Sequence, residues 1–158
     1  MARVLVTGMS GAGKTTLLQE LARRGYRTID TDYDGWVLPD GTWDEPRMSA
    51  LLAAELSLVV SGTVGNQRRF YDRFAAVVLL SAPVEVLIDR VSARANNPYG
   101  KSADDQSVIR RNVLDVEPLL RNGATLELDG RRPVADLADE VGRLASGPPG
   151  NGASPGRS

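Results

Sequence analysis

Residues 8–15, GMSGAGKT, allow few local structures. They follow the apolar run RVLVT at residues 3–7, and leucines at helical spacing follow at positions 17, 18 and 21. A glycine-rich turn between a buried strand and a helix directs successive backbone N–H groups at one point, to which the helix adds its positive end. The pattern G-x-x-x-x-G-K-[ST] therefore predicts a loop that binds nucleotide phosphates.

Two side chains of this loop have specific expected roles. The ammonium group of Lys14 is expected to reach the β- and γ-phosphates, and the hydroxyl of Thr15 is expected to bind Mg²⁺. The predicted nucleotide-binding residues in this region are Gly8, Ser10, Gly11, Ala12, Gly13, Lys14, Thr15 and Thr16.

Strand and helix patterns alternate along the rest of the chain. Strands are expected at 3–7, 26–30, 58–61, 75–80 and 125–128, and helices at 15–24, 46–57, 67–73, 83–95, 103–120 and 133–144. This alternation predicts an α/β fold with a parallel sheet covered on both faces. Residues 1–145 are expected to form one domain, and the Gly/Pro/Ser-rich residues 146–158 a disordered tail.

The composition excludes several kinds of chemistry. The chain has neither Cys nor His, so disulfides, thiolate nucleophiles, imidazole bases and Cys/His zinc sites are excluded. With 19 basic and 20 acidic residues, it lacks the basic excess of proteins that bind nucleic acid or membrane surfaces. We find no leader or membrane-spanning segment and expect a cytoplasmic protein whose partners are a nucleotide and a small molecule.

Acidic residues follow the second predicted strand. Asp30 and Asp32 stand two positions apart at its carboxyl end, where open parallel sheets bind ligands. We expect Asp30 to face the Mg²⁺ hydration shell, Asp32 to face the incoming hydroxyl or phosphate of the acceptor, and one of the two to accept a proton from an acceptor hydroxyl. Asp34 follows in the same loop and leaves this assignment open, and a solvated strand end is the alternative.

The order strand–GMSGAGKTT–helix–strand–DTD resembles the small P-loop phosphotransferases of the shikimate kinase, gluconate kinase and adenylate kinase group. The resemblance covers residues 1–144, with SGTVGNQ at 61–67 in the Walker B region. It implies a three-layer α/β/α fold with a five-stranded parallel sheet of order 2-3-1-4-5. It also implies an acceptor-binding segment near 33–57 and a short lid near 96–105.

Arginines would complete the nucleotide site. Arg90 and Arg94 share one helix face at a spacing of four residues. The resemblance implies that Arg90 packs on adenine, that Arg94 contacts phosphate, and that Arg110 or Arg111 contacts the transferring phosphates. It also places Arg131 in the loop on the adenine side. Solvated basic faces and a polar turn are the alternatives.

The acceptor side is less defined. The candidate acceptor-binding residues are Asp32, Trp36, Arg47, Asn66 and Arg68. Trp36 and Trp43 fit substrate contact and attachment of the loop to the core equally well. The shikimate kinases have a glycine triplet where this chain has Gly62-Thr63-Val64, and an acceptor-binding arginine where it has Val116. These two departures argue against shikimate as the acceptor.

Together these features predict an Mg²⁺- and ATP-dependent phosphotransferase that moves the γ-phosphoryl group to a hydroxyl or phosphate of a small molecule. A nucleoside monophosphate kinase is the alternative within enzymes, and a nucleotide-binding regulatory ATPase module is the alternative of another class. The sequence leaves open the acceptor, the choice between ATP and GTP, and whether the protein is a monomer or a dimer.

Overall fold

A computed structural model describes residues 2–93 and 102–146. The strands are β1 (Arg3–Thr7), β2 (Thr28–Asp30), β3 (Leu58–Ser61), β4 (Ala76–Ser81) and β5 (Leu126–Asp129). The helices are α1 (Lys14–Arg23), α2 (Glu45–Ala54), the 3₁₀ helix η1 (Gln67–Arg73), α3 (Val84–Ser92), α4 (Ala103–Gly123) and α5 (Val134–Ser146).

The five strands form one sheet in the order β2-β3-β1-β4-β5, and every pairing is parallel. The central strand is β1, in which Val4 is paired with Val59 of β3 on one side and Ala76 of β4 on the other. The carboxyl ends of parallel strands meet at one edge. The loops after β1, β2, β3 and β5 therefore start along the same edge of the sheet, although the ends of β1 (Thr7) and β5 (Asp129) are 122 positions apart in sequence.

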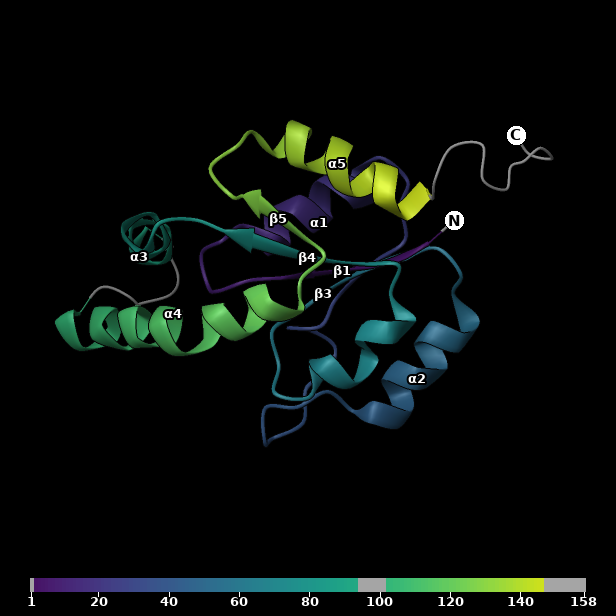
Figure 1. The fold of residues 1–158 in the computed structure, drawn as a ribbon, viewed down its shortest axis with the longest axis horizontal. Coiled ribbons are helices and arrows are strands. Elements are labelled where there is room, and N and C mark those ends of the chain that lie inside the picture. Colours follow the sequence, from purple (N-terminus) through teal and green to yellow (C-terminus); the bar gives the residue numbers. More distant parts are fainter. Residues whose placement is uncertain (1, 94–101, 147–158) are drawn as a thin grey trace.

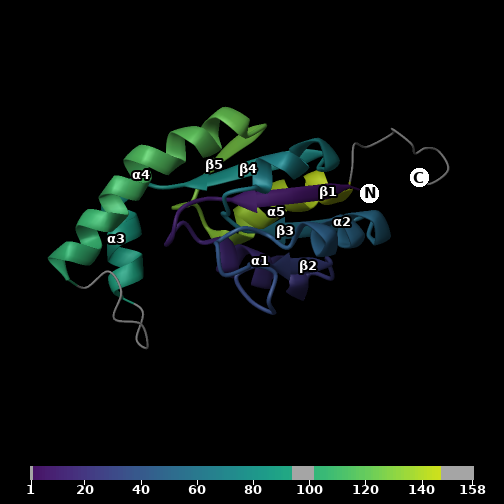
Figure 2. The ribbon, with the colours of Figure 1, turned by 90° about the horizontal axis from the view of Figure 1, so that it is seen from below.

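Alternation along the strands distributes the apolar side chains between two cores. Val4 and Val6 of β1 belong to the cluster that also contains residues of α1 and α5, whereas Leu5 belongs to the cluster with α2 and η1. Figure 1 shows α1 and α5 on one side of the sheet and α2 on the other. The view in Figure 2 shows α3 and the first part of α4 beyond the end of the sheet at which β4 and β5 finish, while the last part of α4 runs back beside these strands.

The predicted fold class and strand order are confirmed, and the differences lie at the ends of helices and strands; β2, for example, begins at Thr28 and not at residue 26. Helix α2 stops at Ala54, three residues before the predicted end, because Glu55 is extended (φ −112°, ψ 118°). Helix α4 continues to Gly123 past Pro118, and Leu120 on the following turn is buried in the core. Ser102 caps the start of α4 by accepting a hydrogen bond from the Asp105 amide at 3.0 Å, so the last residues of the predicted lid are helical.

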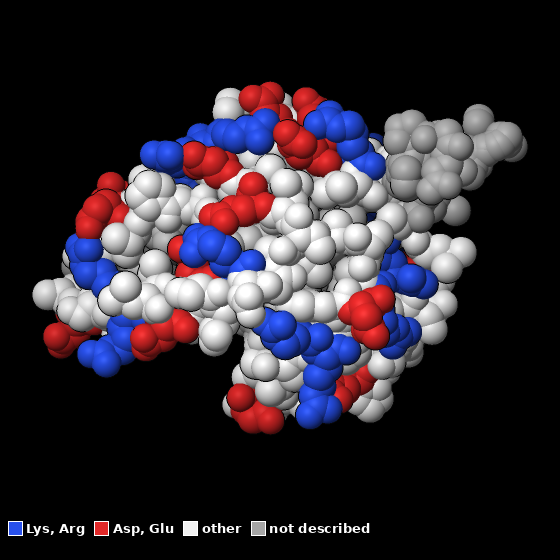
Figure 3. All heavy atoms as spheres, in the orientation of Figure 1, with Lys and Arg blue, Asp and Glu red and all other residues white. Residues whose placement is uncertain are grey.

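The rest of the predicted lid and nearly all of the predicted tail lie outside the described residues. Figure 3 shows basic and acidic side chains interspersed on the visible face, in keeping with a net charge of −1. In the part of the chain that the structure describes, none of the helices combines the length and apolar character needed to cross a bilayer.

Candidate active site

The loop between β1 and α1 has the backbone that the motif predicts. Gly11 and Gly13 have φ angles of 86° and 107°, in the left-handed region that glycine alone adopts without strain. A side chain at Gly8 would overlap the carbonyl oxygen of Leu80 in β4. No side chain caps α1, so the first amides of this helix point into the loop without a side-chain acceptor. The loop is therefore built to present N–H groups to an anion.

The ammonium group of Lys14 lies inside this loop. Its Nζ donates hydrogen bonds to the carbonyl oxygens of Gly8 at 2.8 Å and Met9 at 3.3 Å. Lys14 is partly buried and lines a cavity of about 580 Å³. The cavity is bounded by Ser10, Gly11, Gly13, Lys14, Thr15, Thr16, Gln19, Asp32, Tyr33 and Arg90. One cavity thus contains most of the predicted loop residues together with Asp32.

Thr15 and Asp30 meet at the edge of this cavity. The Thr15 hydroxyl donates to Asp30 Oδ2 at 2.9 Å, and the Asp32 amide donates to Asp30 Oδ1 at 3.1 Å. Asp30 therefore links the helix that follows the loop to the backbone at Asp32. The carboxylate of Asp32 is exposed on the cavity wall.

These oxygen donors fit a magnesium ion that is shared with a nucleotide. Within residues 2–93 and 102–146, the acidic side chains form no group of three able to hold a metal alone. Mg²⁺ commonly takes one or two protein oxygens and completes its shell with phosphate oxygens and water. The Thr15 hydroxyl and the Asp30 carboxylate, placed beside the phosphate loop, supply that kind of donor set.

Arg90 also lines this cavity, and its side chain binds backbone carbonyl groups. Its guanidinium donates to the carbonyls of Gly11 at 3.1 Å, Ala12 at 3.2 Å and Gly130 at 2.8 Å. A Cβ at Gly130 would lie only 2.6 Å from the Ala12 oxygen. Arg90 therefore holds the phosphate loop close to the loop after β5. It also lines a second cavity of about 260 Å³, with Ala12, Gly13, Thr16, Gly130, Arg132, Val134 and Leu137.

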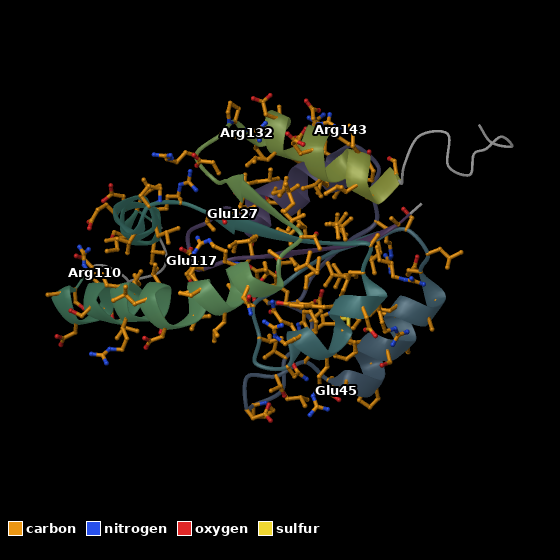
Figure 4. The ribbon with its side chains drawn as sticks, viewed as in Figure 1. Glu45, Arg110, Glu117, Glu127, Arg132 and Arg143 are labelled. Atoms are coloured by element: carbon orange, nitrogen blue, oxygen red, sulfur yellow. The ribbon has the colours of Figure 1, made fainter. Side chains whose placement is uncertain are left out.

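The other predicted phosphate-side arginines either do not line this cavity or lie outside the described residues. Arg110, labelled on α4 in Figure 4, is paired with Glu85 on α3, with N–O distances of 2.5 and 3.1 Å. This pairing lowers the pKa of Glu85. Arg111 is exposed on α4, and Arg94 lies outside the described residues. Figure 4 also labels Glu117 and Glu127, which Arg121 bridges at 3.3 and 2.8 Å to join α4 to β5.

Arg131 forms an ion pair with Asp129 just after β5. Its Nη2 lies 2.8 Å from Asp129 Oδ2, and the Arg131 amide donates to Oδ1 at 2.8 Å. The side-chain hydrogen bonds from Arg131 lower the pKa of Asp129 to about 2 from its ordinary 3.8.

We expect Arg131→Ala to raise the pKa of Asp129 toward 3.8, as measured by an NMR pH titration of its side-chain carboxyl. A lowered carboxyl pKa stabilises the fold above the unfolded-state pKa, and this contribution is lost as the pH falls through the folded-state value. The melting-temperature difference between wild type and variant should therefore shrink as the pH falls from 4 toward 2. An unchanged Asp129 pKa in the variant would contradict the assignment.

The acceptor segment is tied closely to the core. Trp36 and Trp43 are both buried, and the Trp43 indole N–H donates to the Thr31 hydroxyl at 3.0 Å. The Arg47 guanidinium stacks on the Trp36 ring at 3.8 Å and donates to the Asp34 carbonyl at 2.8 Å. Asp34 itself has a φ of 67°. Two contacts therefore fix the Arg47 side chain, and the Trp36 ring beneath it belongs to the core.

Asn66 and Arg68 also make contacts within the protein. The Asn66 side chain accepts from the Trp43 amide at 2.9 Å and donates to the Trp43 carbonyl at 3.1 Å and to Glu45 at 2.9 Å. Arg68 donates to the Leu119 carbonyl at 3.4 Å and lies over the Tyr71 ring. Asn66 thus fastens the acceptor segment to the loop after β3.

Four residues near the site were not among the predicted site residues. Gln19 and Tyr33 line the main cavity, and Thr63 and Gln67 contact the base of the phosphate loop. Gln19 lies one helical turn beyond Thr15, and Tyr33 directly follows Asp32, so spacing alone could have indicated both.

Comparison with known proteins identifies the family of the chain. A model of the AAA domain family matches residues 4–111. The shikimate kinase of Bordetella pertussis is 31% identical over 160 aligned positions, which cover 87% of this chain and 75% of the relative. A shikimate kinase of Acinetobacter baumannii, solved in complex with shikimate, has a TM-score of 0.68 at 25% identity and covers 91% of this chain and 92% of that one.

A gluconokinase of Sinorhizobium meliloti shares the fold, with a TM-score of 0.57 at 21% identity over 90% of this chain and 89% of that one. The family match spans the phosphate loop, Asp30 and Arg90, and the relatives cover nearly the whole fold. The chain belongs to the AAA domain family of P-loop proteins and, within it, to the ATP-dependent small-molecule kinases that include the shikimate kinases.

Proposed function

We propose that this kinase uses Mg²⁺-ATP to phosphorylate a hydroxyl group of a small, anionic acceptor other than shikimate. The observation that supports this best is the position of Asp32. Its exposed carboxylate shares a cavity of about 580 Å³ with Lys14 and Thr15, and its amide is bonded to Asp30. A carboxylate that faces the phosphate loop from the end of β2 is suited to an incoming hydroxyl.

The residues divide the work of the transfer. The amides of the loop and the Lys14 ammonium group bind the phosphates. Thr15 and Asp30 would hold a magnesium ion, which would supply positive charge beside the phosphates. Asp32 accepts the proton of the acceptor hydroxyl while the oxygen of that hydroxyl forms a bond to the γ-phosphorus. The bond from that phosphorus to the bridging oxygen breaks, so ADP and the phosphorylated acceptor leave.

The arginines near the nucleotide site take two proposed roles, support of the phosphate loop and neutralisation of the transferring phosphoryl group. Arg90 supports the loop through its carbonyl contacts and stands between the two cavities, where a nucleoside would extend from the phosphates. Arg94 and either Arg110 or Arg111 remain our candidates for neutralising the transferring group. Arg110 would have to exchange Glu85 for phosphate to take this role.

Two positions favour an acceptor that differs from shikimate. Thr63 carries a side chain inside the segment where the shikimate kinases have a glycine triplet, and its hydroxyl is engaged by Gly8. Val116 stands in place of an acceptor-binding arginine and packs against the core of α1 and α5. Arg47, held over Trp36, remains as the cation for an anionic group of the acceptor.

The nucleoside monophosphate alternative has less support. Trp36 and Trp43 are the tryptophans of the acceptor segment, and both are buried, with Arg47 covering the Trp36 ring. Neither offers an open ring face for a base. We place the enzyme in the cytoplasm, where ATP is supplied.

An acceptor panel tests the proposal. ADP release by the full chain with Mg²⁺-ATP is measured against sugars, sugar acids, polyols and nucleoside monophosphates, with Lys14→Ala as the inactive control. We expect stimulation by one class of hydroxyl acceptor, absent in the control. Stimulation by nucleoside monophosphates alone would favour the alternative kinase, and ADP release that no acceptor changes would favour a regulatory ATPase module.

A further inference from the structure

Thr63 follows β3 and reaches the first residue of the phosphate loop. Its hydroxyl donates to the Gly8 carbonyl oxygen at 2.6 Å and accepts a hydrogen bond from the Gly8 amide at 3.2 Å. Gly8 is buried, and its own Cα lies so close to β4 that a Cβ would overlap Leu80. Thr63 therefore holds both polar groups of a residue that has no room to move.

The Thr63 hydroxyl belongs to a chain of hydrogen bonds in which the donor and acceptor of each bond can be assigned. Thr63 has one hydroxyl proton, which it gives to Gly8, so the 3.2 Å contact between Thr7 Oγ1 and Thr63 Oγ1 uses the proton of Thr7. Thr7 in turn accepts from Gln67 Nε2 at 3.0 Å. The second Nε2 proton of Gln67 goes to Tyr71, and Gln67 Oε1 accepts from the Val64 amide at 2.8 Å.

The Gly8 carbonyl oxygen accepts two hydrogen bonds, from two different side chains. It accepts from the Thr63 hydroxyl and, at 2.8 Å, from Lys14 Nζ, so both of its lone pairs are used. Binding of the β- and γ-phosphates draws the ammonium group of Lys14 toward them and away from this carbonyl. Without Thr63 the oxygen would then be buried and unpaired, which opposes the movement of the lysine.

We propose that Thr63 is a positioning residue for nucleotide binding: it keeps the Gly8 carbonyl satisfied when Lys14 turns to the phosphates. This inference rests on the proposed role of Lys14 in phosphate binding. It assigns a role to the side chain that replaces one glycine of the shikimate kinase triplet. It also explains why that side chain ends in a hydroxyl, since a valine of the same shape could not make these bonds.

The test measures the affinity for Mg²⁺-ADP by calorimetry and the KM for ATP, using the full chain. We expect Thr63→Val to weaken ADP binding and raise the KM for ATP about tenfold, a larger change than in kcat. Thr63→Ser, which keeps the hydroxyl, should bind ADP within about twofold of wild type. Should Thr63→Val fail to fold, Thr63→Ala serves in its place, with the same expected loss.

Two results would overturn the inference: wild-type ADP affinity in Thr63→Val or Thr63→Ala, or an equal loss in Thr63→Ser. A fall in melting temperature with unchanged ADP affinity shows a purely structural role and overturns it as well. Lys14→Ala separates this failure from that of the proposed function. If Lys14→Ala binds ADP as wild type does, the role of Lys14 itself is wrong; if it loses binding while Thr63→Val does not, only the role of Thr63 is wrong.

Discussion

Asp32→Asn is expected to lower kcat by about 10²- to 10⁴-fold, the range that a positioned general base contributes. The amide is almost the same size as the carboxylate but does not accept the proton of the acceptor hydroxyl. Since the Asp32 backbone amide, rather than its side chain, binds Asp30, the pair of Thr15 and Asp30 should remain intact. The affinity for Mg²⁺-ADP is therefore expected to stay within about twofold of wild type.

Asp34→Asn is the matched control for this experiment. Asp34 belongs to the same acidic stretch, and asparagine tolerates its left-handed backbone (φ 67°) as well as aspartate does. Its contact with Arg47 uses the carbonyl oxygen, which the substitution retains. We expect Asp34→Asn to keep most of the activity. A larger loss of kcat in Asp34→Asn than in Asp32→Asn would assign the base to Asp34 instead.

Trp43→Ala is expected to reduce the free energy of unfolding by about 3–5 kcal/mol, as large-to-small changes at buried aromatic sites do. Trp43 is fully buried, contacts Phe70 edge-on with ring centroids 5.8 Å apart, and donates its indole N–H to Thr31. Removing the ring opens a cavity between the acceptor segment and η1. Urea unfolding followed by circular dichroism measures the change.

Trp43→Phe separates packing from hydrogen bonding at this position. Phenylalanine fills most of the volume but does not donate to Thr31, whose own hydroxyl still donates to the Ser61 carbonyl at 2.7 Å. A cost of roughly 1–2 kcal/mol is expected. An alanine variant as stable as the phenylalanine variant would show that Trp43 does not anchor the segment.

The local parts of this structure are predictable from the sequence. The phosphate loop, the strands and the pair Asp30 and Asp32 depend on neighbouring residues, and a glycine pattern or an apolar run indicates each of them. The strand order came from the resemblance, because periodicity does not say which strands are neighbours. The burial of Trp36 and Trp43 was left open, since their sequence context is polar and only the packing of α2 and η1 against the sheet encloses them.

The contacts that the sequence did not predict join residues that are far apart in the chain. Arg90 donates to the carbonyl of Gly11, 79 positions earlier, and to the carbonyl of Gly130, 40 positions later. Backbone acceptors of this kind leave no pattern in a sequence. The pairing of Arg110 with Glu85 depends on how α3 and α4 pack. Thr63 stands out in the sequence only as a departure from a glycine triplet, because its contacts are with Gly8, 55 positions earlier.

The acceptor segment contributes Trp36, Trp43, Met48 and Leu52 to the core on one face of the sheet. The same stretch of chain thus supplies both the surface that we propose for acceptor binding and a wall of the hydrophobic interior. Directed evolution toward a new acceptor will therefore tend to lower thermal tolerance, and is best started from a parent stabilised elsewhere, for example on α5.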